Sequence, residues 1–131
     1  MADRWTIAVA DRWTMAVKKL IQMTRDGELR WRPSHELCGR CKETDIVSPA
    51  YLAEVDGKRV AIFEYRFMSF TDAEVWHWDT GVTIEFVDQN HESEWVWPSP
   101  QGRFELLDAV RYQAAEADDF LNRFLATPTV G

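Results

Sequence analysis

The residues with the most chemical character stand close together between positions 35 and 41. His35, Cys38 and Cys41 follow the spacing His-x-x-Cys-x-x-Cys. Two thiolates at this spacing can bind one zinc ion from a tight turn, and His35 would be a third ligand. A structural zinc site has four ligands, and the remaining histidines, His77 and His91, are far along the chain. Zinc at these three residues is therefore the alternative hypothesis, and the leading expectation is that the protein needs no cofactor.

The same cysteine pair is similar to the Cys-Gly-x-Cys motif of thioredoxin-like proteins. Those proteins place the pair after a strand and at the start of a helix. Here Cys38 and Cys41 fall in a segment of loop composition, after a predicted helix and before predicted antiparallel strands. We therefore expect two reduced thiols in a loop rather than a redox centre.

Four tryptophans form the second group of interest. Trp76 alternates with Trp78, and Trp95 with Trp97, so each pair shares one face of a predicted strand. Tryptophan is enriched at protein interfaces, and the four residues are predicted to form a binding or oligomer interface. The alternative is that they pack beneath the predicted helices. Aromatic platforms also stack nucleic-acid bases, but they need a basic groove, and residues 47–131 carry a net charge of −9. Nucleic-acid binding is therefore not expected.

Other catalytic patterns are weak. Adjacent acids such as Asp118 and Asp119 are expected by chance in a chain with 22 Asp and Glu residues. The sequence holds no Ser-His-Asp spacing, Walker loop, dinucleotide fingerprint or His-Glu-x-x-His motif. A non-enzymatic role is favoured over an enzyme with a Trp-lined cleft.

Length and composition restrict the class of protein. The 131 residues correspond to a single domain, and 46% apolar residues exclude a disordered chain. The sequence has no apolar run of transmembrane length and no visible secretory signal, so no membrane partner is expected. Two cysteines do not make a disulfide framework, which favours the cytoplasm. The net charge of −7 makes the protein acidic.

The chain begins with a short repeat. Residues 2–9 and 10–17 read ADRWTIAV and ADRWTMAV, and we expect residues 1–10 to be a duplicated extension that lengthens a helix or lies loose. Residues 11–26 have helical apolar spacing, with Asp11 as cap and Gly27 as stop. A short strand is predicted at residues 29–32, with Trp31 buried between helix and sheet.

The middle of the chain is predicted to be β structure. Residues 33–49 have the composition of a loop. Residues 51–55 and 60–70 flank Asp56-Gly57, a strong signal for a β-hairpin. Residues 74–78 and 82–87 are either two strands or one bent strand with a bulge at Gly81. Residues 94–97 are the last predicted strand.

A long C-terminal helix is predicted after Ser99-Pro100, a typical N-cap and first-turn pair. Its apolar seam has spacings of three and four and consists of Leu107, Val110, Ala114, Ala117, Leu121 and Phe124. The order helix, strands, helix predicts one α+β domain over residues 1–131. Both helices are expected on one face of an antiparallel meander of four to five strands.

The chain resembles a group of small uncharacterised bacterial proteins in two places. Residues 20–31 match the opening pattern L-I-x-x-T-x-x-G-x-L-x-W of that group, and residues 106–111 and 119–125 fit its closing helix. The resemblance implies the same order of helix, strands and closing helix. It implies no activity and no functional residue.

The predicted function is a small protein-binding domain that forms a homodimer. Two helices cover only one sheet face, whereas the strand at residues 60–70 carries apolar residues on both faces. Large exposed apolar patches are rare in soluble monomers, and a twofold dimer is the commonest way to cover them. We expect at least one of the four tryptophans at the contact. The rival is a monomer in which the loop at residues 33–49 covers that face.

Overall fold

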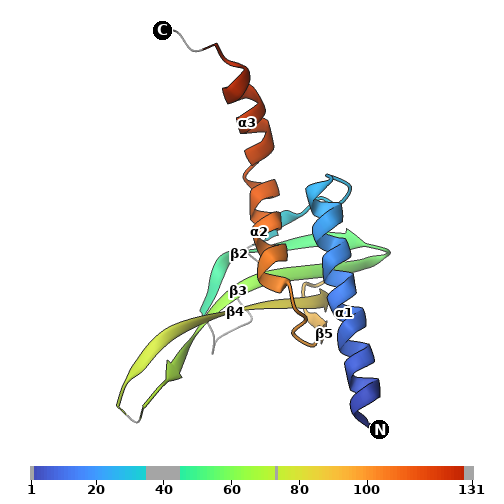
Figure 1. Cartoon of the computed structure of the whole chain (residues 1–131), viewed down its shortest axis with the longest axis vertical. Helices are drawn as coiled ribbons and strands as arrows, with labels where there is room; N and C mark the ends of the chain where they lie inside the picture. Colours follow the sequence, from blue (N-terminus) through green and yellow to red (C-terminus); the bar gives the residue numbers. More distant parts are fainter. Residues whose placement is uncertain (1, 35–44, 73, 129–131) are drawn as a thin grey trace.

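The fold is an α+β meander, described by a computed structural model for residues 2–34, 45–72 and 74–128 (Figure 1). Five strands pair in sequence order, and every neighbouring pair is antiparallel. Two helices pack on one face of this sheet, as the sequence predicts. The elements in chain order are α1 (Ala2–Arg25), β1 (Arg32–Ser34), β2 (Asp45–Val55), β3 (Lys58–Phe70), β4 (Trp76–Val87), β5 (Ser93–Val96), α2 (Arg103–Ala114) and α3 (Ala117–Ala126).

Helix α1 includes both copies of the repeat. It begins at Ala2, so the first copy extends the helix, and the predicted cap at Asp11 is wrong because the helix continues through that residue. The end of the helix is as predicted. Gly27 adopts a left-handed conformation with φ of 78°, and the Leu29 N–H donates to the Met23 carbonyl at 3.1 Å.

The segment after α1 is held by side-chain hydrogen bonds. The predicted burial of Trp31 is confirmed, although β1 begins one residue later, at Arg32. The indole N–H of Trp31 donates to Thr24 Oγ1 at 2.9 Å. Gln113 of α2 accepts from the Trp31 backbone N–H at 2.9 Å and donates to the carbonyls of Thr24 (3.1 Å) and Leu29 (2.6 Å). The three hydrogen bonds of Gln113 therefore connect α2 to the end of α1 and to the segment that follows it.

The predicted loop at residues 33–49 is wrong at both ends. Pro33 lies in the edge strand β1, where its missing N–H is tolerated. Strand β2 begins at Asp45 and pairs with β3 through a register irregularity between Val47 and Tyr51. The Asp56-Gly57 turn is confirmed, with φ of 51° and 79°. Residues 35–44 lie outside the described part of the chain.

Strand β4 is a single strand without a bulge at Gly81. The register between β3 and β4 is continuous from Arg59–Val87 to Phe70–Trp76. Gly81 lies opposite Tyr65, and the Tyr65 ring occupies the space that a Cβ at Gly81 would need. The glycine therefore accommodates an aromatic side chain rather than a bend.

The main core lies between the helices and the sheet. Its buried residues come from α1, the segment after it, the strands and α2, and include Val17, Leu20, Trp31, Ile62, Ile84, Leu106 and Val110. A second, smaller cluster of buried residues on the opposite sheet face includes Leu52, Ala61, Phe63 and Val87. Phe63 is thus buried within a single chain, and the predicted homodimer is not needed to cover it.

The C-terminal helical segment differs most from its prediction. Helix α2 begins at Arg103 rather than at Ser99-Pro100, because Gly102 with φ of 88° is its N-cap and a Cβ there would approach Val17 of α1. The predicted continuous helix is also broken. Glu116 has left-handed φ and ψ values of 53° and 41°, and α3 starts after this break and leads on to the top of the molecule (Figure 1).

Candidate protein-binding surface

The β3–β4 hairpin extends beyond the part of the sheet that carries the helices. Figure 1 shows it as a projection at the lower left, well away from α1. Residues 60–63 of β3 and 81–82 of β4 are buried, whereas most side chains nearer the hairpin end are exposed. We call residues 66–80 the arm.

One face of the arm is apolar. Met68 pairs directly with Trp78, and Phe70 pairs directly with Trp76. Opposite residues of an antiparallel pair point to the same side, and by strand alternation this is the side on which Ile62 and Ile84 face the helices. We call these four residues the arm quartet. They are 46–66% exposed, so the helix-bearing face of the sheet continues as an open apolar surface.

Ring contacts organise this face. The rings of Trp76 and Trp78 meet edge to face, with centroids 6.1 Å apart at 88°. The Arg66 guanidinium carbon lies 5.5 Å from the Trp78 ring centre, within cation–π range. On the reverse face, Phe67 packs against Tyr65 with centroids 5.7 Å apart. The aromatic side chains of the arm thus contact their neighbours on both faces of the hairpin.

The other predicted tryptophans lie at the opposite end of β4. Trp95 pairs with Phe86, and Trp97 follows β5 and is only 5% exposed. Trp13 of α1 packs against both at tilted ring angles, with ring centroids 5.1 Å from Trp95 and 4.6 Å from Trp97. These indoles therefore attach α1 to the sheet edge, and the four predicted site residues do not form one cluster.

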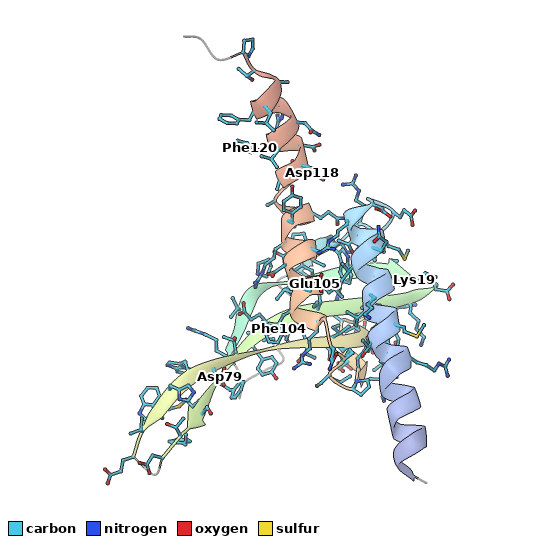
Figure 2. All side chains as sticks on the ribbon, in the orientation of Figure 1. Lys19, Asp79, Phe104, Glu105, Asp118 and Phe120 are labelled. Carbon is cyan, nitrogen blue, oxygen red and sulfur yellow. The ribbon has the colours of Figure 1, made fainter. Side chains whose placement is uncertain are left out.

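Helix α3 presents a second open apolar surface. None of residues 117–126, all of which the structure describes, is buried. The large apolar residues of α3 have helical spacings of three and four and share one side, with the charged residues opposite. We call them the α3 stripe: Phe120, Leu121, Phe124 and Leu125, which are 41–75% exposed. Phe120 and Phe124 stack with ring centroids 5.4 Å apart, and Figure 2 shows Phe120 projecting from α3 into open space.

A hydrogen bond secures the break between α2 and α3. The Tyr112 hydroxyl donates to Asp118 Oδ1 at 2.7 Å. Residues six apart do not face each other on a continuous α-helix, so this bond requires the left-handed residue at Glu116. The bond raises the pKa of Tyr112 above its usual value, with smaller contributions from desolvation and from the Asp118 charge.

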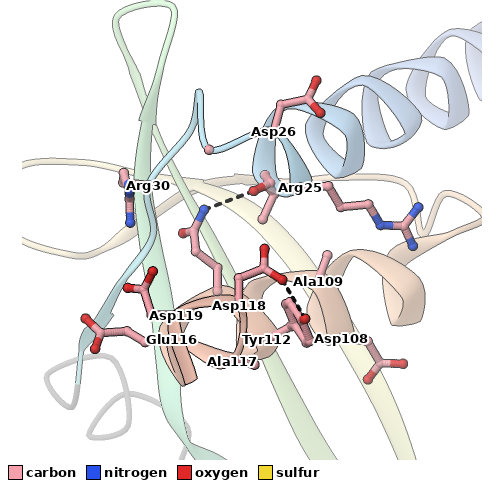
Figure 3. Close-up of a pocket in the computed structure, with 13 residues that line it drawn as sticks. Arg25, Asp26, Arg30, Asp108, Ala109, Tyr112, Glu116, Ala117, Asp118 and Asp119 are labelled. Atoms are coloured by element: carbon pink, nitrogen blue, oxygen red, sulfur yellow. Dashed lines mark hydrogen bonds between the residues drawn. The ribbon is translucent and has the colours of Figure 1, made fainter. Parts of the chain in front are cut away.

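A polar groove of about 550 Å³ lies where α1 ends and α2 meets α3 (Figure 3). Its lining holds two arginines, Arg25 and Arg30, and five acids: Asp26, Asp108, Glu116, Asp118 and Asp119. Gln113 and Tyr112 also line it, and their hydrogen bonds hold the chain together. The five acids come from α2, from α3 and from the turns that follow α1 and α2, so we interpret the groove as a water-filled gap between helices.

The predicted zinc ligands His35, Cys38 and Cys41 lie outside the described residues. Within the described ranges, no group of three or more His, Cys, Asp or Glu side chains is placed to hold a metal ion. In that same part of the chain, no helix has both the length and the hydropathy needed to cross a membrane.

Comparison of the chain with protein-family models, with curated proteins and with solved structures gave no match. The candidate surface therefore rests on its own geometry. Sequence reasoning identified Trp76 and Trp78 but missed Met68, Phe70 and the α3 stripe. Part of the signal for the stripe was present in the sequence, because Leu121 and Phe124 belong to the predicted apolar seam, whereas Phe120 and Leu125 were not singled out.

Proposed function

We propose that this chain is a non-enzymatic protein-binding domain that acts as a homodimer in the cytoplasm and binds through the arm quartet. The observation that carries the proposal is the pairing of Met68 with Trp78 and of Phe70 with Trp76 on one open sheet face. Aromatic residues and Met are enriched in interfaces because they contribute large contact areas at low entropic cost.

The size of the surface supports this role. A fully exposed large apolar side chain presents roughly 200 Å². At 46–66% exposure, the arm quartet therefore presents about 420 Å² of apolar area. This lies within the range of the largest apolar patch on a typical monomer, a patch that is often functional. Single exposed apolar residues elsewhere on the surface are common in proteins and do not indicate a binding site.

The test is multi-angle light scattering at micromolar concentrations. The parent protein should have twice the chain mass of 15.3 kDa. The double variant Trp76→Ser/Trp78→Ser should shift to the mass of one chain while retaining its far-UV circular dichroism spectrum. The matched control is Phe104→Ser, which removes an aromatic ring of similar exposure (48%) from α2. It should remain dimeric.

Ionic strength gives an independent readout. Each chain carries a net charge of −7, so the two copies repel each other, and added salt screens that repulsion. An apolar contact should therefore tighten as salt rises, whereas binding of a basic partner to the acidic surface should weaken. A parent protein that has the mass of one chain at 100 µM, or a Trp76→Ser/Trp78→Ser variant that still dimerises, would contradict the proposal.

A further inference from the structure

Helix α3 has features that call for a covering partner. It is only ten residues long, and isolated helices shorter than about 12–15 residues are marginal in water. Helices in proteins are stabilised mainly by packing of their apolar face, yet all four side chains of the α3 stripe are exposed. An ordered α3 therefore implies a surface that covers the stripe.

The described part of the same chain leaves all four side chains of the α3 stripe exposed and so does not provide that surface. The left-handed Glu116 separates α3 from α2, and the Tyr112–Asp118 hydrogen bond links the two helices across this break. Figure 1 shows α3 leading away from the sheet at the top of the molecule, while the arm extends from the sheet at the lower left. In the same view, Phe120 projects toward the side on which the arm lies (Figure 2). The two open apolar surfaces therefore lie on separate projections of one chain.

We propose that two copies of this chain exchange these projections, so that the α3 stripe of each protomer lies on the arm quartet of the other. This inference rests on the proposed function and names the segment that occupies the arm. Figure 1 shows α2 and α3 rising above the sheet to the top of the molecule, while the arm extends from the sheet at the lower left. A twofold rotation can place two copies so that the end of each α3 meets the end of the arm of the other copy. Such a contact is reciprocal, as twofold symmetry requires.

The areas favour exchange over simpler pairings. With roughly 200 Å² for each fully exposed large side chain, the α3 stripe presents about 470 Å², similar to the arm quartet. Exchange covers both surfaces and gives about 900 Å² per chain, which matches the roughly 800 Å² per partner of a standard stable interface. Contact of α3 with α3, or of arm with arm, covers only half of this area and leaves the other surface open.

The decisive experiment is complementation between two defective variants. The arm variant is Trp76→Ser/Trp78→Ser, which keeps α3 intact. The helix variant is Phe120→Ser/Phe124→Ser, which keeps the arm intact. Each variant alone has two damaged contacts and should have the mass of one chain by light scattering. An equimolar mixture can form one intact contact, between the α3 of the arm variant and the arm of the helix variant.

Exchange therefore predicts that the mixture forms a heterodimer. Its dissociation constant should be at least about tenfold lower than that of either variant with itself, the scale of one interface hot spot. A tag on one variant identifies the heterodimer by co-purification, and Phe104→Ser again controls for loss of an exposed ring. Circular dichroism and urea unfolding confirm that each variant is folded, which is expected because none of the four substituted side chains is buried.

Other outcomes separate this inference from the proposed function. If the helix variant still dimerises while the arm variant does not, α3 is not the occupant of the arm, although the arm remains a binding surface. If only the helix variant is monomeric, α3 pairs with α3 and both proposals are wrong. A mixture that gains no association over its components also overturns the exchange.

Discussion

Replacing Gln113 by Ala tests how the N-terminal and C-terminal parts of the fold are joined. The Gln113 amide makes three hydrogen bonds to the backbone of the last turn of α1 and of the segment that follows it, at distances of 2.6–3.1 Å. Trp31, whose backbone N–H is one of the partners, is buried in the main core. The substitution leaves one backbone donor and two backbone acceptors without their side-chain partner.

The expected loss of stability follows from these bonds. A hydrogen bond contributes about 0.5–1.5 kcal/mol, and an unsatisfied buried group costs more. Gln113 is half-buried, so water can replace part of what is lost. We expect the free energy of unfolding to fall by about 2–3 kcal/mol. For a domain of this size, that corresponds to a decrease in melting temperature of roughly 10 °C.

The assay is urea unfolding followed by circular dichroism, at one protein concentration because association adds to stability. The matched control is Gln22→Ala on α1. Gln22 also donates two hydrogen bonds, both at 3.0 Å, but to the exposed carboxylate of Asp26. That variant should change stability by less than about 0.5 kcal/mol. If Gln113→Ala is as stable as Gln22→Ala, the amide does not hold the two segments together and the reasoning is refuted.

Three further predictions concern other parts of the molecule. Gly81→Ala should destabilise the fold by about 1–3 kcal/mol in urea unfolding, because its methyl group meets the Tyr65 ring, and Tyr65→Ala should relieve most of that loss. The raised pKa of Tyr112 means that its hydrogen bond contributes stability below the usual tyrosine pKa of about 10 and loses it as pH rises through the folded value. Ultraviolet titration should therefore show one phenol that ionises late, and Asp118→Asn should lower its midpoint; an unchanged midpoint contradicts this assignment. Deleting residues 2–9 should leave the rest of the fold intact and cost less than about 1 kcal/mol, whereas a melting decrease beyond roughly 8 °C would show that the first repeat packs into the core.

The sequence by itself determined most of the sheet. The Asp56-Gly57 turn was predictable because a tight hairpin needs two residues with positive φ, a local requirement that few residue pairs meet. Alternation along residues 60–70 fixed which side chains share a face, since the strand period is two. The end of α1 at Gly27 was predictable because glycine readily adopts the left-handed conformation that stops a helix. The burial of Trp31 was predictable from its alternation with charged residues after that stop.

Tertiary contacts decided what local preference left open. Gly81 looks like a bulge in sequence, but its role is set by Tyr65, a residue on the neighbouring strand. Pro33 and Pro49 suggest a loop, yet strands β1 and β2 include them because an edge position and a register irregularity tolerate a missing N–H. The sequence did not distinguish among the four tryptophans. In the structure, Trp13 of α1 packs against Trp97, which is buried, whereas Trp76 and Trp78 on the arm are half exposed.

The C-terminal helices show the division between sequence and structure most clearly. The apolar spacing of residues 107–124 suits one continuous helix, and the residues around Glu116 are good helix formers, so nothing local predicts a break. In the structure, α2 ends at Ala114, and the Tyr112–Asp118 bond spans a left-handed residue at Glu116. A periodic pattern specifies that a helix has an apolar side. It does not specify what covers that side, because the covering surface is formed by segments far away in the chain or by another molecule.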